Sequence, residues 1–268
     1  MPVIPITDAA LNVEQHGSGP ALLLIAGLGG RLQFWHRQVA AFARHFRVVL
    51  HDHRGTGGST RSVIAYSIRQ MADDVLALMD ALNIDRAHLV GHSTGGAIAQ
   101  LLALDHPDRV GRIVLSATWP GPDAYFKALF DLRLQILTAA GPAAYLGDGI
   151  LRAFPPAWLQ THAGVIAATE HERLAAFPGV EIEARRIAAV QAHDLRARLG
   201  AIAKPTLVVC AEDDAITPLP FSREVAALIP GARLATLPMG GHFAPQVDPD
   251  GYNRTVLRFL TEETASHA

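Results

Sequence analysis

The stretch "HLVGHSTGGAIAQLLAL" (His88–Leu104) decides the fold. An apolar run ends at Gly91, a Gly-x-Ser-x-Gly pattern centred on Ser93 follows, and an Ala-rich apolar run begins after Gly96. Such a serine lies on a tight turn between a strand and a helix, where flanking glycines let the turn pack against neighbouring backbone. Serine is a weak nucleophile on its own, so the pattern gains weight only if the chain supplies a base and an acid.

Short apolar runs elsewhere in the chain predict further buried strands, at residues 21–27, 46–52, 87–91, 112–117, 206–211 and 233–238. They are apolar on both faces, which is typical of parallel strands covered by helices on both sides. Helical patterns separate them, with a capping box at Ser67 and an N-cap at Asp248 followed by Pro249. This alternation predicts an α/β fold with a mostly parallel sheet.

The alternation is interrupted once, because residues 119–198 contain no strand pattern. Ala-rich helical stretches fill this segment, with breaks at Gly141-Pro142, Pro155-Pro156 and Pro178-Gly179. We expect a helical cap at 119–198, inserted into a core formed by residues 1–118 and 199–268. A cap that leaves from the carboxyl end of a strand would lie over the crevice where open α/β sheets bind ligands. We expect most of its aromatic side chains to form the cap's own core, with Trp119 as the exception that lines a pocket.

Composition and charge exclude several classes of function. The net charge of −2 gives no basic field for nucleic acid or a membrane surface. The lone cysteine, Cys210, rules out an internal disulfide and is expected to be a buried core residue. No signal-peptide pattern and no run long enough to span a bilayer are visible, so a cytoplasmic location is expected. The sequence leaves the oligomeric state open.

Candidate partners for Ser93 follow the last two predicted strands. The stretch "EDDAITP" (212–218) comes after the run at 206–211, and "GGH" (240–242) comes after the run at 233–238. The chain order Ser, acid, His is the order that this strand-to-helix elbow requires. Because parallel strands end at the same edge of a sheet, His242 and either Asp213 or Asp214 should lie beside Ser93.

With these elements and the motifs "AGLGG" (26–30) and "DHRGTGGS" (52–59), the chain resembles the α/β-hydrolases over nearly its full length. The resemblance implies a triad of Ser93, His242 and Asp214, since the family's acid has the form Asp-x-x-Thr-Pro; Asp213 is the second choice. It also implies an oxyanion hole made by the backbone N–H groups of Leu28 and Thr94, and no cofactor or metal. At the first of these turns the chain departs from the family's usual His-Gly by having Ala26-Gly27.

Within that family the chain resembles two branches that act on small acids. The strings "AGLGG", "DHRGTG", "YSIRQMADD", "GPAAYL" and "FPPAWL" are similar to the aminoacrylate hydrolases of pyrimidine degradation. The elements "TLVV…D…TP" and "GGH" are similar to the 3-oxoadipate enol-lactonases, and "STGG" is similar to cofactor-free haloperoxidases and perhydrolases. Both small-acid branches imply an anionic small-molecule substrate. Candidate carboxylate partners in the cap are Arg133, Arg152, Arg173, Arg185 and Arg186.

The expected function is therefore a serine hydrolase acting on an ester, a lactone or an enamine- or amide-type small acid. A general carboxylesterase or perhydrolase is an alternative, and so is a non-catalytic ligand-binding protein that keeps the fold. His51 and His53 share one face of a strand end, which could suggest a metal pair, but we interpret them as ordering a loop. His92, beside the nucleophile, is expected to pack beneath the turn rather than act as the base.

Overall fold

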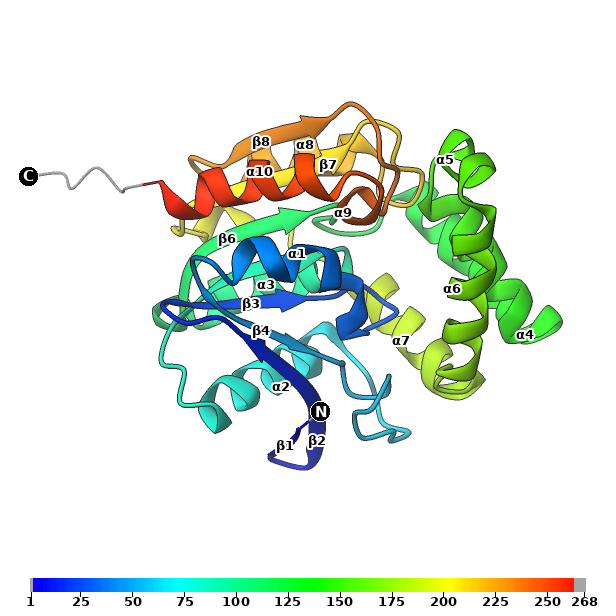
Figure 1. The fold of residues 1–268 in the computed structure, drawn as a ribbon, viewed down its shortest axis with the longest axis horizontal. Coiled ribbons are helices and arrows are strands. Elements are labelled where there is room, and N and C mark those ends of the chain that lie inside the picture. The colour runs from blue at the N-terminus through cyan, green and yellow to red at the C-terminus, as the bar shows by residue number, and fades with distance from the viewer. Residues whose placement is uncertain (1, 263–268) are drawn as a thin grey trace, which may run out of the picture.

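A computed structural model describes residues 2–262, the side chain of Val165 excepted. Eight strands of this part form one sheet in the order β1-β2-β4-β3-β5-β6-β7-β8 (Figure 1). The strands are β1 (Val3–Ile6), β2 (Ala9–His16), β3 (Ala21–Ile25), β4 (Arg47–His51), β5 (Ala87–His92), β6 (Val110–Ser116), β7 (Thr206–Ala211) and β8 (Arg233–Leu237). Every neighbouring pair from β4 to β8 is parallel, so the predicted mostly parallel sheet is confirmed.

The sequence did not predict the hairpin of β1 and β2 at one edge of the sheet. β2 runs antiparallel to both β1 and β4. β1 carries Pro5 and has no fully buried residue, while only Leu11, Asn12 and Val13 of β2 are buried. An edge hairpin with so little buried apolar surface leaves almost no hydrophobic pattern in the sequence.

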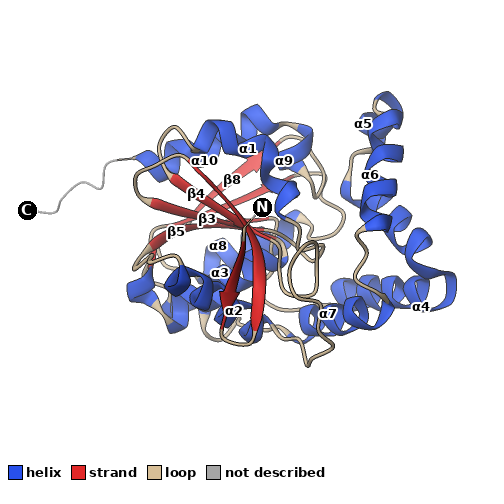
Figure 2. Ribbon diagram, turned by 60° about the horizontal axis from the view of Figure 1, so that its bottom comes forward, coloured by secondary structure: helices blue, strands red, loops and turns tan. Residues whose placement is uncertain are grey.

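Helices cover both faces of the sheet (Figure 2). One layer contains α1 (His36–Phe42), α9 (Ala244–Val247) and α10 (Pro249–Thr261); the other contains α2 (Ile68–Ala81), α3 (Thr94–Asp105) and α8 (Leu219–Leu228). Short 3-10 helices occur at Leu32–Trp35, Pro107–Arg109 and Leu199–Ala201. Successive β3 residues enter opposite apolar cores, Leu22 and Leu24 one, Leu23 and Ile25 the other, as alternating side chains of a strand must.

The two predicted helix starts are present. The Ser67 side chain accepts a hydrogen bond from the Gln70 backbone N–H (3.0 Å), and the Asp248 side chain accepts one from the Gly251 N–H (2.9 Å). Gln70 turns its own side chain to Asp74 instead of back to Ser67, so only half of the capping box forms. Each cap satisfies an N–H group that the helix itself leaves without a partner.

The predicted helical cap is confirmed as α4 (Ala124–Ala153), α5 (Pro156–Thr161), α6 (Ala163–Ala175) and α7 (Val180–Ala192). The predicted breaks fall where helices kink or begin. Gly141 (φ 83°) kinks α4, Pro156 opens α5, and Gly179 precedes α7. The cap lies beyond the carboxyl ends of the parallel strands (Figure 1). No helix among the described residues is long and apolar enough to cross a membrane.

Candidate active site

The turn that holds Ser93 joins β5 directly to α3. Its backbone has φ 53° and ψ −115°, a left-handed conformation that a residue with a side chain adopts only at a cost. Ser93 N–H donates to the Ser116 carbonyl of the neighbouring strand (2.8 Å), and Gly96 N–H donates to the Ser93 carbonyl (2.9 Å). These bonds fix the strained turn between β5, β6 and α3.

The glycines around Ser93 are required by the close approach of backbone. A Cβ atom on Gly91 would lie 2.1 Å from the Gly95 carbonyl oxygen, and one on Gly95 would lie 2.1 Å from the Ile25 carbonyl oxygen. No side chain fits at either distance. The Gly-x-Ser-x-Gly pattern therefore has a steric cause in this fold, because β3, β5 and α3 meet at the serine.

Asp214 and His242 form a buried pair beside this turn. His242 Nδ1 lies 2.9 Å from Asp214 Oδ2. The carboxylate is held by the backbone N–H groups of Ile216 and Thr217 (2.8 and 2.9 Å to Oδ1) and by the Thr217 hydroxyl (2.9 Å to Oδ2). A carboxylate only accepts hydrogen bonds, so Nδ1 carries the ring proton and Nε2 is left as the basic nitrogen.

The neighbouring acid, Asp213, makes a different contact. Its Oδ1 accepts a hydrogen bond from the backbone N–H of Gly241 at 2.8 Å. Asp213 therefore supports the loop that carries His242, while Asp214 contacts the imidazole itself. Of the two candidates that the sequence offered, the geometry favours Asp214 as the acid.

The turn after β3 approaches Ser93 closely. A Cβ atom on Gly27 would lie 3.3 Å from Ser93 Cβ, and the turn is closed by a bond from Gly30 N–H to the Gly27 carbonyl (2.9 Å). Leu28 lines the same cavity as Ser93. Thr94 is the first residue of α3, where helix N–H groups have no partner within the helix. The two N–H groups named as the oxyanion hole thus belong to backbone that meets at the serine.

Arg186 of the cap forms a hydrogen bond to the turn after β3. Its side chain is completely buried, and Nη2 donates to the Leu28 carbonyl (2.7 Å) while Nη1 donates to the Arg54 carbonyl (2.9 Å). Glu183 lies 3.9 Å away and is itself bonded by the Tyr145 hydroxyl (2.7 Å). Burial raises the pKa of Glu183 and lowers that of Arg186. Arg186 thus contacts the protein's own carbonyls and does not line the cavity.

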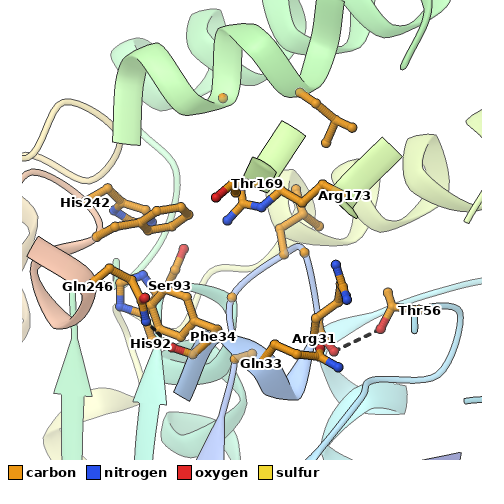
Figure 3. A pocket seen from close by; sticks show the side chains of 18 of the residues that line it. Arg31, Gln33, Phe34, Thr56, His92, Ser93, Thr169, Arg173, His242 and Gln246 are labelled. Atoms are coloured by element: carbon orange, nitrogen blue, oxygen red, sulfur yellow. Dashed lines mark hydrogen bonds between the residues drawn. The ribbon is translucent and has the colours of Figure 1, made fainter. Parts of the chain in front are cut away.

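Between the cap and the strand ends lies a cavity of about 300 Å³. Ser93 and His242 both face it (Figure 3). The structure gives no hydrogen bond between Ser93 and His242 within the described residues. Catalytic hydrogen bonds are often long or poorly aligned before the substrate binds. Much of the wall is aromatic, formed by Phe34, Phe130, Phe154, Trp158, Phe177 and Phe243.

Most of these wall residues were missed in the sequence. Phe243 directly follows His242, and Phe34 comes shortly after the "AGLGG" motif, so nearness to a motif was the available signal. Phe154 and Trp158, whose rings stack 4.7 Å apart, belong to or pack against the apolar core as expected, and both also line the cavity.

Trp119, in contrast, is not among the cavity-lining residues, and this corrects the expectation from the sequence. It is almost fully buried (1% exposed), with its ring 4.8 Å from that of Phe126 and 5.7 Å from that of His193. Its carbonyl accepts a bond from Gln100 Nε2 (3.1 Å). The chain turns inward after β6, so Trp119 packs the junction between cap and core.

Two of the five cap arginines line the cavity, Arg133 and Arg173. Arg152 and Arg185 instead form ion pairs within their own helices, with Asp148 (2.7 Å) and Glu181 (3.0 Å). The sequence could not separate these cases, because helical phase and cap orientation together decide which arginine turns inward.

Of the three other histidines singled out in the sequence, His51 and His53 lie outside the cavity lining, whereas His92 lines the cavity beside Ser93. His92 stacks on Phe34 (ring centroids 4.6 Å apart) and contacts Ser116 Oγ (3.3 Å), and burial holds its pKa well below the ordinary value. His51 and His53 stack on each other 5.3 Å apart. Among the described residues no group of three or more His, Cys, Asp or Glu is placed to hold a metal.

This combination of a doubly covered parallel sheet, a serine elbow and a cap defines a class of enzyme. The family model described as "alpha/beta hydrolase fold" matches residues 20–249, and the chain belongs to that family. Hydrolases of known sequence or structure are similar to this chain over almost their whole length.

Curated relatives carry the name "Putative carbamate hydrolase RutD". The protein from Caulobacter sp. (strain K31) is 41% identical, covering 97% of this chain and 98% of the relative. That from Variovorax paradoxus (strain S110) is 42% identical, covering 95% and 97%. Among solved structures, the enol-lactonase from Burkholderia xenovorans LB400 is 32% identical, with a TM-score of 0.90 over 97% of this chain and 100% of the other.

Proposed function

We propose that this protein is a cofactor-free serine hydrolase of small acyl compounds, with Ser93 as the nucleophile. One observation carries the proposal: the Asp214–His242 pair and the strained Ser93 turn face the same cavity, beside the backbone of Leu28. This is the constellation that activates a serine hydroxyl, with an acid that orients a base and a base that faces the same cavity as the nucleophile.

In the proposed reaction, Ser93 Oγ attacks the substrate carbonyl carbon while His242 Nε2 takes the hydroxyl proton. The negative oxygen that forms is held by the N–H groups of Leu28 and Thr94. Each such donor typically contributes about 3 kcal/mol to the transition state. His242 then gives the proton to the leaving group, and water, deprotonated by the same histidine, releases the acyl group from the serine. His242 must be neutral to take this proton.

The comparisons support a small substrate. Relatives near 40% identity are named for carbamate hydrolysis, and the enol-lactonase is close in structure. A cavity of about 300 Å³ with an aromatic wall suits a compact acyl compound. We favour hydrolysis of an enamine- or amide-type small acid, with enol-lactone hydrolysis as the second candidate and general ester hydrolysis or perhydrolysis behind them.

The decisive experiment replaces the nucleophile. Ser93→Ala should lower turnover of p-nitrophenyl acetate and of short-chain esters by up to about a million-fold. The wild type should release a burst of nitrophenolate equal to the enzyme present, since an acyl-enzyme forms first. Ser62→Ala, outside the cavity lining, is the matched control and should keep full activity.

More than a few per cent of activity in Ser93→Ala would overturn the proposed mechanism. A wild type that binds these esters without turnover or burst would favour a ligand-binding protein that keeps the fold. A panel of short esters, an enol-lactone, enamine acids, carbamate and peracid formation, each run beside Ser93→Ala, would then rank the candidate substrates.

A further inference from the structure

Arg173 of α6 presents a cationic side chain to the cavity with no acidic partner. It lines the cavity and is half-buried, and Figure 3 shows its guanidinium directed into the space that Ser93 and His242 also face. Within the described part of the chain, the structure gives this guanidinium no hydrogen bond and no ion pair; its one recorded contact is with the Phe243 ring. A half-buried charge without a counter-ion is costly to retain.

Of the other charged groups around the cavity, Arg37 is exposed to solvent and the rest are engaged with partners. Arg31 pairs with Glu172 at 2.7 Å. Arg133 lies over the Tyr145 ring (4.7 Å) and 3.9 Å from Asp148. Glu183 accepts the Tyr145 hydroxyl. The two carboxylates that line the cavity, Glu172 and Glu183, are thus bonded to other partners, and only the charge of Glu172 acts on Arg173, without a direct contact.

The electrostatics of Arg173 reflect its burial and its positively charged neighbours. Burial, reinforced by the nearby charge of Arg31, lowers the pKa of Arg173 to about 10. The group still carries its full charge near neutral pH. An anion placed beside it would be attracted by a charge that water screens only in part.

The location of Arg173 links it to the reacting centre. Its guanidinium carbon lies 5.2 Å from the centroid of the Phe243 ring, and that ring lies 5.8 Å from the His242 ring. The guanidinium carbon lies over the aromatic ring, and a planar guanidinium presents paired N–H groups that match a planar carboxylate. Two parallel N–H···O bonds are the usual geometry of such a pair. A short ligand could therefore reach from Arg173 to Ser93.

We propose that Arg173 binds a carboxylate of the substrate that is separate from the carbonyl attacked by Ser93. This inference rests on the proposed function and narrows its substrate class to short acyl compounds that carry a second, anionic carboxylate group. A carbamate ion, whose single carboxylate is the reacting group, would not fill both positions.

The test measures binding with the nucleophile removed, so that no turnover is needed. Calorimetry on Ser93→Ala should show binding of monomethyl succinate, with monomethyl malonate and monomethyl glutarate reporting the best spacing. Adding Arg173→Met should weaken the best of the three about tenfold or more, the usual loss for a hydrogen-bonded charge pair. Methyl pentanoate, a neutral ligand of similar length, should keep its affinity within about twofold on the same scale.

One further variant separates charge from shape, and a second is a control. Arg173→Lys keeps the charge without the planar fork and should retain part of the affinity for the anion. Arg185→Met is the matched control, because Arg185 lies outside the cavity lining and pairs with Glu181 (3.0 Å); it should bind both ligands as Ser93→Ala alone does. Thermal unfolding of each variant would verify that it is folded.

The proposal is overturned if Arg173→Met leaves binding of the anions unchanged, if it weakens methyl pentanoate equally, or if Ser93→Ala binds none of the three anions at millimolar concentration. Turnover by the enzyme with Ser93 intact is a separate readout. There, Arg173→Met should raise the KM for the anionic ester more than it lowers kcat, whereas loss of the proposed function would appear as turnover that does not depend on Ser93.

Discussion

At the scale of single residues, the site depends on a division of work between two adjacent acids. Asp214 receives three hydrogen bonds from residues 216 and 217 and one contact from His242, all at 2.8–2.9 Å. Asp213 points the other way and holds the backbone of Gly241. The two adjacent acids therefore make different contacts: Asp214 orients the imidazole of His242, and Asp213 supports the loop that carries it.

This geometry predicts unequal effects of neutralising the two acids. Asp214→Asn should lower kcat by about ten-thousand-fold, because an amide can hold His242 in the wrong tautomer. Asp213→Asn keeps an oxygen able to accept from Gly241 N–H and should cost far less, on the order of tenfold or below. Steady-state kinetics on a nitrophenyl ester would measure both. A larger loss in Asp213→Asn would reassign the acid.

The sequence predicts the three residues of the proposed triad because each follows its own strand. Ser93, Asp214 and His242 come just after β5, β7 and β8, and parallel strands carry whatever follows them to one sheet edge. The choice between Asp213 and Asp214, by contrast, required the family pattern or the structure. Trp119 also follows a strand, and the same reasoning failed there because the chain folds inward under α4.

At the scale of elements, one buried side chain of the cap contacts the turn after β3 directly. Arg186 of α7 donates to the carbonyls of Leu28 and Arg54, which lie in two different loops of the core. The Leu28 carbonyl belongs to the peptide unit that follows Leu28, so this bond restrains the backbone on the carboxyl side of the residue whose N–H is proposed as an oxyanion donor. We therefore propose that Arg186 is a positioning residue for the oxyanion hole assigned to Leu28 and Thr94.

We expect Arg186→Met to lower kcat by about ten- to a hundredfold while KM changes little, since one oxyanion donor is worth up to a thousandfold. It should also reduce the free energy of unfolding by about 3 kcal/mol, because it leaves Glu183 as a buried acid without its cation. Kinetics and urea unfolding on the same samples would measure the two effects.

Arg185→Met, one position earlier on α7, is the control and should change neither quantity appreciably. If the activity lost in Arg186→Met only matches the fraction of unfolded protein, the positioning role fails.

The predictable part of the cap was its helices and their breaks, because Gly and Pro interrupt helices locally. Which cap residues meet the core was not predictable, since it depends on how the whole insertion docks.

At the scale of the whole molecule, buried histidines link stability to pH. Burial lowers the pKa of His51 and of His193 to about 4, and it holds those of His53 and His92 well below the ordinary value. In the unfolded chain the same groups take up protons near pH 6.5. Between about pH 6.5 and 4 the unfolded state therefore binds more protons, and stability falls as the pH is lowered.

His51 and His193 should each remove about 2 kcal/mol of stability between pH 7 and pH 5, the value expected for a group that titrates near 6.5 unfolded and near 4 folded. Urea unfolding across this range would show the fall. His193→Gln should reduce this loss of unfolding free energy between pH 7 and pH 5 by about 2 kcal/mol. His45→Gln, at an exposed position, should not reduce it. A parent protein equally stable at pH 5 and pH 7 would contradict the prediction.

The sequence by itself determined the alternation of strands and helices, the place of the cap and the chain order of the reactive residues. These features follow from local patterns of apolar residues, glycine and proline, which act over a few positions. Only the tertiary structure decided that Arg173 faces the cavity, that Arg186 contacts the turn of Leu28 and that Arg185 pairs with Glu181. Arg173, Arg186 and Arg185 are chemically identical, and packing across distant segments alone gives them different neighbours.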